Sequence, residues 1–500
     1  MKHRRVLANA LSIVTTLVAT ACGSHLAAPE SSLPRSPGIQ YAARAAGTLN
    51  DWSTAAYDLG RTGYNPNEQT IGTGSFTTLH QKWSINVGGQ IGESVFAAGL
   101  LVKKVPTNIL FVPLAGGKIM ARNGDTGALI WSKSFPLSAY NCGLHQSWFG
   151  IASTPVIDRK THRLYVADGI NQVHALDLTT GQEQPGWPIA IAAYTHNDFV
   201  YGALTYNPAN GILYAETSST CDISPWYGRI TAIDTAHATI LNTFFPTQGT
   251  SGGGIWGFGG ASVDQATNDV FVAVGNADVA NATPQNAYYA EQIVELSPDA
   301  SAVLASNFPN ISGIGDDDLD FGATPMLFQP PGCGPMLAAI NKDGSLYLYN
   351  RAAISSGPVQ SIQMSISTDN ADFVGMPAYD PVTNYLYVEQ PATFGIYKPG
   401  VAAFSISSSC TLNPTPVWAA VFGADGALTD DDSLRSPISV ANGVLYISDY
   451  GTSTTYAFDA LSGAQLWSLT LPGPGAVGPI AVDGRLYIGS MGSKMTAFVP

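Results

Sequence analysis

The chain has 500 residues, of which 45% are hydrophobic and 12% are charged, so it can bury a large core and is not an intrinsically disordered protein. Its 36 acidic residues outnumber the 22 basic ones and give a net charge of −14, which repels phosphate backbones and argues against nucleic acid as a partner. The 52 glycines and 32 prolines, without a long amphipathic helical stretch, predict many short strands joined by tight turns.

The N-terminus carries a targeting segment. A positively charged start precedes a mostly apolar stretch over residues 6–18, and the small residues 19–21 stand directly before Cys22. This order is typical of a signal peptide over residues 1–21. A cysteine at the first mature position resembles a lipobox, so we expect a lipid on Cys22 and a membrane-anchored lipoprotein that faces the periplasm or the cell exterior. Without acylation, the protein would be secreted.

Residues 22–50, rich in Ser, Pro and Ala, predict a flexible tether, and no later stretch has the roughly 20 apolar residues of a membrane span. Beyond Cys22 the chain has four cysteines: Cys142, Cys221, Cys333 and Cys410. In an oxidising compartment an even number indicates two disulfides, and the sequence leaves the pairing open. No Cys-x-x-Cys-His occurs, so no c-type haem is attached to this chain.

An internal repeat occupies the rest of the chain. In one unit, Thr154-Pro155 leads to Leu-Tyr-Val at 164–166, Ala-Leu-Asp at 175–177, Thr-Gly at 180–181 and a Trp at 187. Another unit repeats this order from residue 436 to residue 467. The eight units begin at Ser94, Thr154, Ala203, Ala261, Thr324, Pro377, Ser436 and Gly478.

The unit length suits four short strands. Such a unit cannot bury both of its faces alone, and closure into a ring is the simplest way to cover its edges. We therefore predict an all-β fold, an eight-bladed β-propeller of four-stranded antiparallel blades over residues 51–500. The last unit supplies only about three strands before Pro500, so we expect the strand over residues 81–87 to complete the eighth blade. The alternatives are an open array of β-sandwiches and a division into two domains.

The pattern Ala-Leu-Asp, Thr-Gly and Trp resembles the repeat of PQQ-like β-propellers, where PQQ is pyrroloquinoline quinone, over residues 51–500. The segment at 51–66 is similar to the N-terminal strap of quinoprotein alcohol dehydrogenases. Because some proteins with this repeat are envelope assembly lipoproteins that bind no cofactor, each position needs its own argument. The sequence also lacks the adjacent cysteine pair with which the dehydrogenases cover the quinone.

Three positions resemble the family's cofactor and metal site. Trp256, in Gly-Ile-Trp-Gly, stands where the family stacks an indole under the quinone; the alternative is packing between blades. Asn276, in Val-Gly-Asn, matches the amide ligand of Ca²⁺, and the alternative is a turn residue. Glu216 is the nearest match to the family's Ca²⁺-binding glutamate.

Three further positions resemble the reacting groups. Asp320, in Asp-Phe-Gly-Ala, matches the catalytic base and is also a candidate Ca²⁺ ligand beside the acidic run 316–318; the alternative is a solvated loop. Lys342 matches the cation that contacts the quinone oxygens, and the alternative is a hairpin turn. Glu93 stands where the family has a glutamate that touches the cofactor; the alternative is a solvated surface glutamate.

Two functions follow as hypotheses. The resemblance implies an exported dehydrogenase that uses PQQ and Ca²⁺, oxidises an alcohol, sugar or polyol, and passes electrons to a separate acceptor. The alternative is a non-enzymatic propeller lipoprotein that binds envelope proteins as a scaffold. The enzyme hypothesis requires Trp256, Asn276, Asp320 and Lys342 to converge at one end of the central channel.

Overall fold

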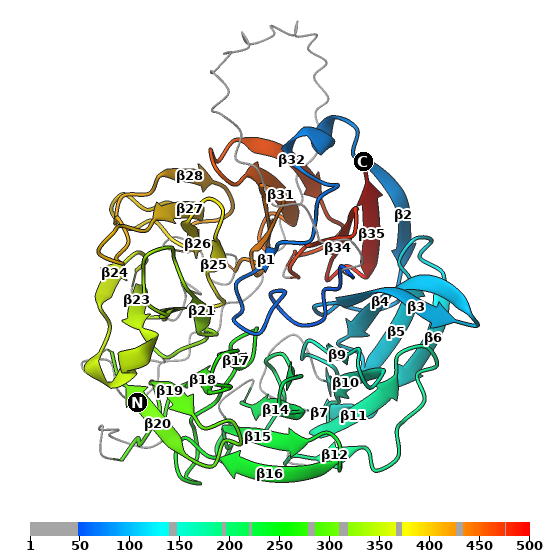
Figure 1. Cartoon of the computed structure of the whole chain (residues 1–500), viewed down its shortest axis with the longest axis horizontal. Coiled ribbons are helices and arrows are strands. Elements are labelled where there is room, and N and C mark those ends of the chain that lie inside the picture. Colours follow the sequence, from blue (N-terminus) through cyan, green and yellow to red (C-terminus); the bar gives the residue numbers. More distant parts are fainter. Residues whose placement is uncertain are drawn as a thin grey trace, which may run out of the picture. The chain divides into compact units, whose positions relative to one another are not determined.

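The computed structural model describes residues 49–139, 148–192, 197–219, 223–278, 286–309, 319–366, 373–426, 434–475 and 477–500. These residues form eight antiparallel blades arranged in a ring (Figure 1), which confirms the predicted eight-bladed β-propeller. Cys22 and the predicted signal peptide lie outside the described residues, as does most of the predicted tether, so these assignments stay predictions. Within the described ranges, no helix has both the length and the apolar character needed to cross a membrane.

Four consecutive strands build each of the first four blades. Blade 1 has β3 (Val95–Val102), β4 (Val105–Leu114), β5 (Lys118–Asn123) and β6 (Leu129–Ser134). Blade 2 has β9 (Val156–Asp158), β10 (Arg163–Ala167), β11 (Gln172–Asp177) and β12 (Ile189–Ala190). Blade 3 has β13 (Thr205–Asn207), β14 (Ile212–Thr217), β15 (Arg229–Asp234) and β16 (Thr239–Phe244). Blade 4 has β17 (Ser262–Val263), β18 (Val270–Ala273), β19 (Ile293–Leu296) and β20 (Val303–Asn307).

The second half repeats this plan until the last blade. Blade 5 has β21 (Met326–Phe328), β22 (Met336–Ile340), β23 (Ser345–Asn350) and β24 (Gln360–Gln363). Blade 6 has β25 (Ala378–Asp380), β26 (Tyr385–Gln390), β27 (Gly400–Ser405) and β28 (Trp418–Val421). Blade 7 has β29 (Ser439–Ala441), β30 (Val444–Asp449), β31 (Thr454–Asp459) and β32 (Gln465–Thr470). Blade 8 has β33 (Ile480–Val482), β34 (Arg485–Gly489), β35 (Lys494–Val499) and the N-terminal β2 (His80–Asn86).

The remaining elements are short. They are β1 (Tyr64–Asn65), the hairpin of β7 (Ser138–Ala139) and β8 (Trp148–Phe149), and the 3₁₀ helices η1 (Thr73–Thr77) and η2 (Arg351–Ser356).

The repeat motif joins each of three blades to the next. Trp131 at the outer edge of blade 1 donates its indole N–H to the carbonyl of Leu178 in blade 2 and lies against Gly181. A Cβ at Gly181 would come within 2.6 Å of the ring, and its φ of 71° favours glycine. The same contacts join Trp418 in blade 6 to blade 7, and Trp83 in blade 8 to blade 1. The glycine of the motif therefore leaves the space into which the tryptophan of the preceding blade packs.

The ring closes because the N-terminal strand completes the last blade. β2 pairs with β35 in antiparallel register, with Asn86 opposite Lys494 and His80 opposite Val499. This confirms the predicted role of residues 81–87. The closure holds the two ends of the propeller together through main-chain hydrogen bonds.

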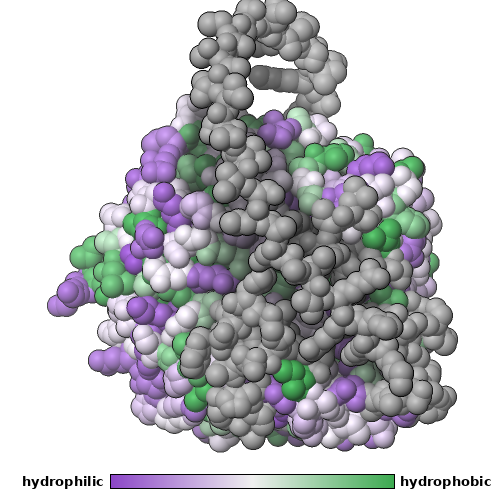
Figure 2. All heavy atoms as spheres, turned by 180° about the vertical axis from the view of Figure 1, so that it is seen from behind, coloured by the Kyte–Doolittle hydropathy of each residue, from purple (hydrophilic) through white to green (hydrophobic). Residues whose placement is uncertain are grey.

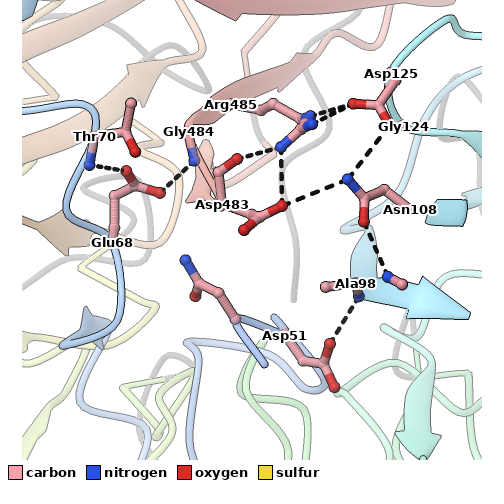
Figure 3. Close-up of polar contacts among 12 residues, drawn as sticks. Asp51, Glu68, Thr70, Ala98, Asn108, Gly124, Asp125, Asp483, Gly484 and Arg485 are labelled. Atoms are coloured by element: carbon pink, nitrogen blue, oxygen red, sulfur yellow. Dashed lines mark hydrogen bonds and ion pairs between the residues drawn. The ribbon is translucent and has the colours of Figure 1, made fainter. Parts of the chain in front are cut away.

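Polar side chains reinforce the closure between blades 8 and 1 (Figure 3). Arg485 of blade 8 forms ion pairs with Asp125 of blade 1 and with Asp483, and Asn108 lies within hydrogen-bond distance of both carboxylates. Glu68 of the N-terminal segment accepts the N–H groups of Thr70 and Gly484. The segment is thereby attached to blade 8.

Residues 52–65 form a strap that crosses the middle of the ring (Figure 1). The strap forms hydrogen bonds with the first strand of every blade, so these first strands line the axis of the ring. The partners are Trp52 with Phe96, Ser53 with Ile157, Arg61 with Thr205, Leu59 with Val263, Gly60 with Leu327, Thr62 with Tyr379, Gly63 with Val440, and Asn65 with Ala481.

One disulfide is present among the described residues. It joins Cys333, in the turn between the first and second strands of blade 5, to Cys410, in the turn after the third strand of blade 6. Cys142 and Cys221 lie outside the described residues, so their pairing stays a prediction. On the far side of the molecule, polar and apolar residues interleave over the described surface (Figure 2).

Candidate functional site at the axial end of blades 4 and 5

The fold places four of the predicted residues at one end of the ring. Trp256 and Asp320 precede the first strands of blades 4 and 5, while Asn276 and Lys342 follow the second strands of the same blades. In an antiparallel sheet the start of one strand and the end of its neighbour lie at the same edge. Because the first strands line the axis, these four positions gather at the axial end of the two blades.

Direct contacts join the four residues into one group. The Oδ2 atom of Asp320 accepts hydrogen bonds from Nε1 of Trp256 at 3.0 Å and from the backbone N–H of Asn276 at 3.2 Å. The Nζ atom of Lys342 lies 3.1 Å from Oδ1 of the same carboxylate and 4.8 Å from the centroid of the Trp256 ring. The structure thus brings together an indole face, a carboxylate and an ammonium group.

Two glycines make this approach possible. A Cβ at Gly275 would lie 2.7 Å from Oδ2 of Asp320, and a Cβ at Gly322 would lie 2.3 Å from the Trp256 ring. Any side chain at either position would push the indole and the carboxylate apart. The glycines of the Val-Gly-Asn and Asp-Phe-Gly-Ala motifs are therefore spacers for the site.

The ion pair is buried. Asp320 is 1% exposed and Lys342 is 6% exposed, whereas the Trp256 ring is half-buried. Removing two charges from water costs free energy that their attraction repays only with good geometry and further hydrogen bonds. The indole N–H, the Asn276 N–H and the cation–π contact supply those further interactions.

Glu216 and Glu93 belong to a second group, which surrounds Arg61 of the strap. Oε1 of Glu216 accepts the N–H of Ala261 at 3.1 Å, and Oε2 has no hydrogen-bond partner among the described residues. Oε2 of Glu93 accepts the hydroxyl of Thr154 at 3.0 Å. Burial raises the pKa of each carboxyl to about 7, and the positive charge of Arg61 opposes both rises.

Arg61, at the centre of this second group, was not identified as a site residue from the sequence. It is 0% exposed and donates to Thr54, Ala55, Thr205 and the carbonyl of Ala261. Burial is the main reason that its pKa falls to about 10. Its only sequence signal was an arginine between Gly60 and Thr62-Gly63 in the strap, where a surface role is the usual interpretation.

The predicted calcium ligands are divided between the two groups. Asp320 is engaged by Lys342, Asn276 meets Asp320 through its backbone, and Glu216 contacts Ala261. Within the described ranges, no group of three or more His, Cys, Asp or Glu side chains is arranged to hold a metal ion. The acidic run 316–318 lies outside those ranges. The metal-binding roles stay predictions.

Known proteins resemble this chain in its repeat and its fold. Residues 61–236 match the PQQ_2 family model, described as outer membrane protein assembly factor BamB. A europium-containing methanol dehydrogenase superposes with a TM-score of 0.66 at 15% identity, over 90% of this chain and 98% of that one. The quinohemoprotein alcohol dehydrogenase of Comamonas testosteroni gives 0.63 at 15% identity, over 90% and 80%.

A computationally designed protein, Ika8, also superposes, with a TM-score of 0.52 at 11% identity over 84% of this chain and 99% of that one. No curated protein sequence matches the chain. The predicted resemblance to PQQ-like β-propellers is confirmed by the repeat and the fold together. At these identities the solved structures show the fold alone, and a designed protein shares it.

Proposed function

We propose that this chain is a quinoprotein dehydrogenase that oxidises a hydroxylated substrate at the axial end of blades 4 and 5. The observation that carries the proposal is the contact group of Trp256, Asp320 and Lys342. These residues come from two blades and match the family's motif in type and position. Packing alone does not require a buried ion pair on an indole face.

The residues present fit a flat, anionic quinone. Trp256 has a half-buried planar ring of the kind that stacks on a quinone, and Lys342 has a positive charge that pairs with quinone oxygens, but its Nζ now lies over one face of that ring. Asn276 and Glu216 have oxygens of the type that Ca²⁺ prefers, but they belong to the two separate groups described above, so the described residues do not form a calcium site. When bound, the quinone supplies the acceptor for the hydride of the substrate.

The chain's own groups then have distinct tasks. The carboxylate of Asp320 takes the proton of the substrate hydroxyl, and the indole N–H of Trp256 holds the carboxylate in place. Lys342 stabilises negative charge that develops beside the ring. Burial of the pair excludes water from these contacts. The chain has no haem motif, so electrons leave to a separate acceptor.

The test has two readouts. PQQ with Ca²⁺ is titrated into the mature protein while tryptophan fluorescence is followed, and dye reduction is then measured with a panel of alcohols and polyols. We expect Asp320→Asn to lower dye reduction by roughly 100-fold or more while quinone binding persists. Trp256→Ala weakens quinone binding. The matched control is Asp299→Asn in an outer turn of blade 4, which leaves both unchanged. Absence of quinone binding by the wild-type protein refutes the proposal.

A scaffold function is the second candidate. The observation that favours it is the cation–π contact, which places the Lys342 ammonium on the very indole face that a quinone would need. The description of the family model matched by residues 61–236 fits such a role in the cell envelope. Recovery of the same envelope protein by wild-type and Asp320→Asn chains, with no quinone bound, would favour this function.

The envelope location is part of both candidates. We propose that Cys22 carries the lipid anchor and that the propeller faces the periplasm or the cell exterior. Mass spectrometry of the purified protein tests this directly, since acylation adds the mass of its fatty chains and Cys22→Ser removes it. A mature N-terminus elsewhere in the chain would contradict the assignment.

A further inference from the structure

Blade 1 departs from the repeat in the hairpin between its first two strands, β3 and β4. In blade 2 the corresponding turn spans only residues 159–162, whereas residues 98–108 separate the paired Ala97 and Ile109 in blade 1. Beyond a bulge that ends at Leu100, three further residue pairs extend the hairpin by about 10 Å. The hairpin therefore projects outside the ring (Figure 1).

The projecting tip is apolar on both of its faces. Leu101 is 63% exposed and Val105 is 61% exposed, which places them among the four most exposed large hydrophobic residues of the described ranges. The register pairs Leu101 with Pro106 and Val102 with Val105, so these two exposed side chains lie on opposite faces of the hairpin. Figure 2 shows hydrophobic and hydrophilic residues side by side on this projection, at the left edge of the view.

The end of the tip is basic. Lys103 and Lys104 form the exposed turn with φ angles of 49° and 70°, a pair of conformations for which hairpins prefer Asn-Gly, so the turn itself does not favour two lysines. Exposed Lys160 lies in the neighbouring turn of blade 2, where Arg159 donates to the carbonyl of Ala98 at the base of the hairpin. Positive charge is thus concentrated here on a chain with a net charge of −14.

The described part of the chain begins beside the base of the same hairpin. Asp51 accepts the N–H of Ala98 at 2.8 Å, and Trp52 exchanges two main-chain hydrogen bonds with Phe96. A lipid anchor on Cys22 would therefore be connected to the propeller next to β3.

We propose that the tip of this hairpin, residues 101–106, inserts into the surface of the anionic membrane that holds the lipid anchor. The proposal rests on the anchor proposed above for Cys22 and is independent of quinone chemistry. The two turn lysines contact anionic headgroups, while Leu101 and Val105 reach the boundary between headgroups and acyl chains. A protein partner would cover one face of the hairpin, whereas a membrane surrounds an inserted tip and covers both.

The acidic body of the propeller explains why the hairpin has to project. An anionic membrane repels a chain with a net charge of −14, and salt at about 0.1 M screens this repulsion over about 10 Å. The hairpin extends over a similar distance, so its lysines reach the headgroups before the acidic body comes close. Because the lipid anchor already holds the chain at the membrane, weak contacts of the tip are enough to orient the ring. The candidate site lies at the other end of the first strands and stays accessible from solution.

The first test measures vesicle binding without the lipid anchor. The full mature chain with Cys22→Ser is mixed at low ionic strength with vesicles of equal parts phosphatidylglycerol and phosphatidylcholine, and bound protein is measured by sedimentation. We expect the double variant Lys103→Ala, Lys104→Ala to lower the partition coefficient by about 25-fold, since each lysine at the surface contributes about fivefold. The matched control is the double variant Lys82→Ala, Lys398→Ala, at exposed positions away from the hairpin, where we expect no change.

The second test measures insertion by the lipidated protein in the same vesicles. A nitrobenzoxadiazole dye on Val105→Cys should emit at shorter wavelength than in solution and be protected from an aqueous quencher. The control is the dye on Ile396→Cys, which is as exposed, at 63%, but lies between β26 and β27, at the opposite edge of its blade. Wild type carried through the same labelling gives the background from native cysteines.

The two tests overturn the proposal in different ways. If the unlipidated chain does not bind these vesicles, or binds equally without the two lysines, the tip does not recognise anionic headgroups. If the dye on Val105→Cys emits as in water while the lipidated protein is bound, the tip does not insert, although the anchor stands. Equal shifts at both dye positions would also overturn it, because the contact would not belong to the hairpin. Failure of the quinone titration would overturn only the dehydrogenase proposal.

Discussion

Replacing Arg61 by methionine tests whether the strap organises the axial end of the propeller. The guanidinium donates to four groups in the strap and in blades 3 and 4, and the side chain is fully buried. Methionine has a similar volume but removes these donors, and only the Ala261 carbonyl keeps another one, the hydroxyl of Thr205. Breaking a buried charged network in this way costs about 3–5 kcal/mol. With an unfolding entropy of about 2.1 cal/mol/K per residue over about 450 residues, the melting temperature should fall by about 3–5 °C.

The pH dependence of this loss identifies its cause. In the folded protein Glu93 and Glu216 have pKa values raised to about 7, so they bind protons that the unfolded chain releases above about pH 4.5. A carboxyl with a raised folded pKa lowers stability as pH increases. Without Arg61 these pKa values rise further, and the deficit of the variant should therefore be larger at pH 8 than at pH 5.

Differential scanning calorimetry across this pH range measures the deficit. The control is Lys133→Met, which removes a partly exposed pair with Glu183 and should cost less than about 1 kcal/mol. Limited proteolysis should also cleave the strap of the Arg61 variant sooner than that of wild type. A variant that melts within 1 °C of wild type, with the same pH profile, refutes the role assigned to Arg61.

Three further perturbations have calculable results. The Cys333→Ala variant loses the bridge between blades 5 and 6 and should lose about 2–4 kcal/mol in denaturant unfolding. Gly322→Ala should weaken quinone binding, because its Cβ would lie 2.3 Å from the indole; fluorescence titration measures this. Burial lowers the pKa of His174, but hydrogen bonds and charges from Asp168 and Glu183, which flank the imidazole, outweigh burial and raise the pKa above its usual value. The wild-type protein should therefore be more stable than His174→Gln by a constant amount below about pH 6.5, and this difference should disappear as pH rises through the raised folded pKa of His174. Thermal melts across this pH range measure the difference.

Each of these has a result that would contradict it. Equal denaturant midpoints of Cys333→Ala and wild type under oxidising conditions would show that the bridge contributes nothing. Unchanged quinone affinity of Gly322→Ala would mean that the indole moves without cost. A difference between His174→Gln and wild type that grows with pH would mean that the imidazole is held neutral.

The sequence predicted the parts of the fold that recur. A motif repeated eight times identifies the blades, and the missing outer strand of the last unit identifies residues 81–87 as its replacement. The candidate site residues came from the resemblance to quinoprotein dehydrogenases; the structure brings them together at one end of the ring, and their roles stay predictions. The convergence of Trp256, Asp320 and Lys342 follows from strand order alone.

Arg61 was out of reach of that reasoning. It is charged and buried, and burial of a charge depends on what several distant segments place around it. Its neighbours come from the strap and from residues 205 and 261. No repeat motif marks this position, because the strap precedes the first repeat unit.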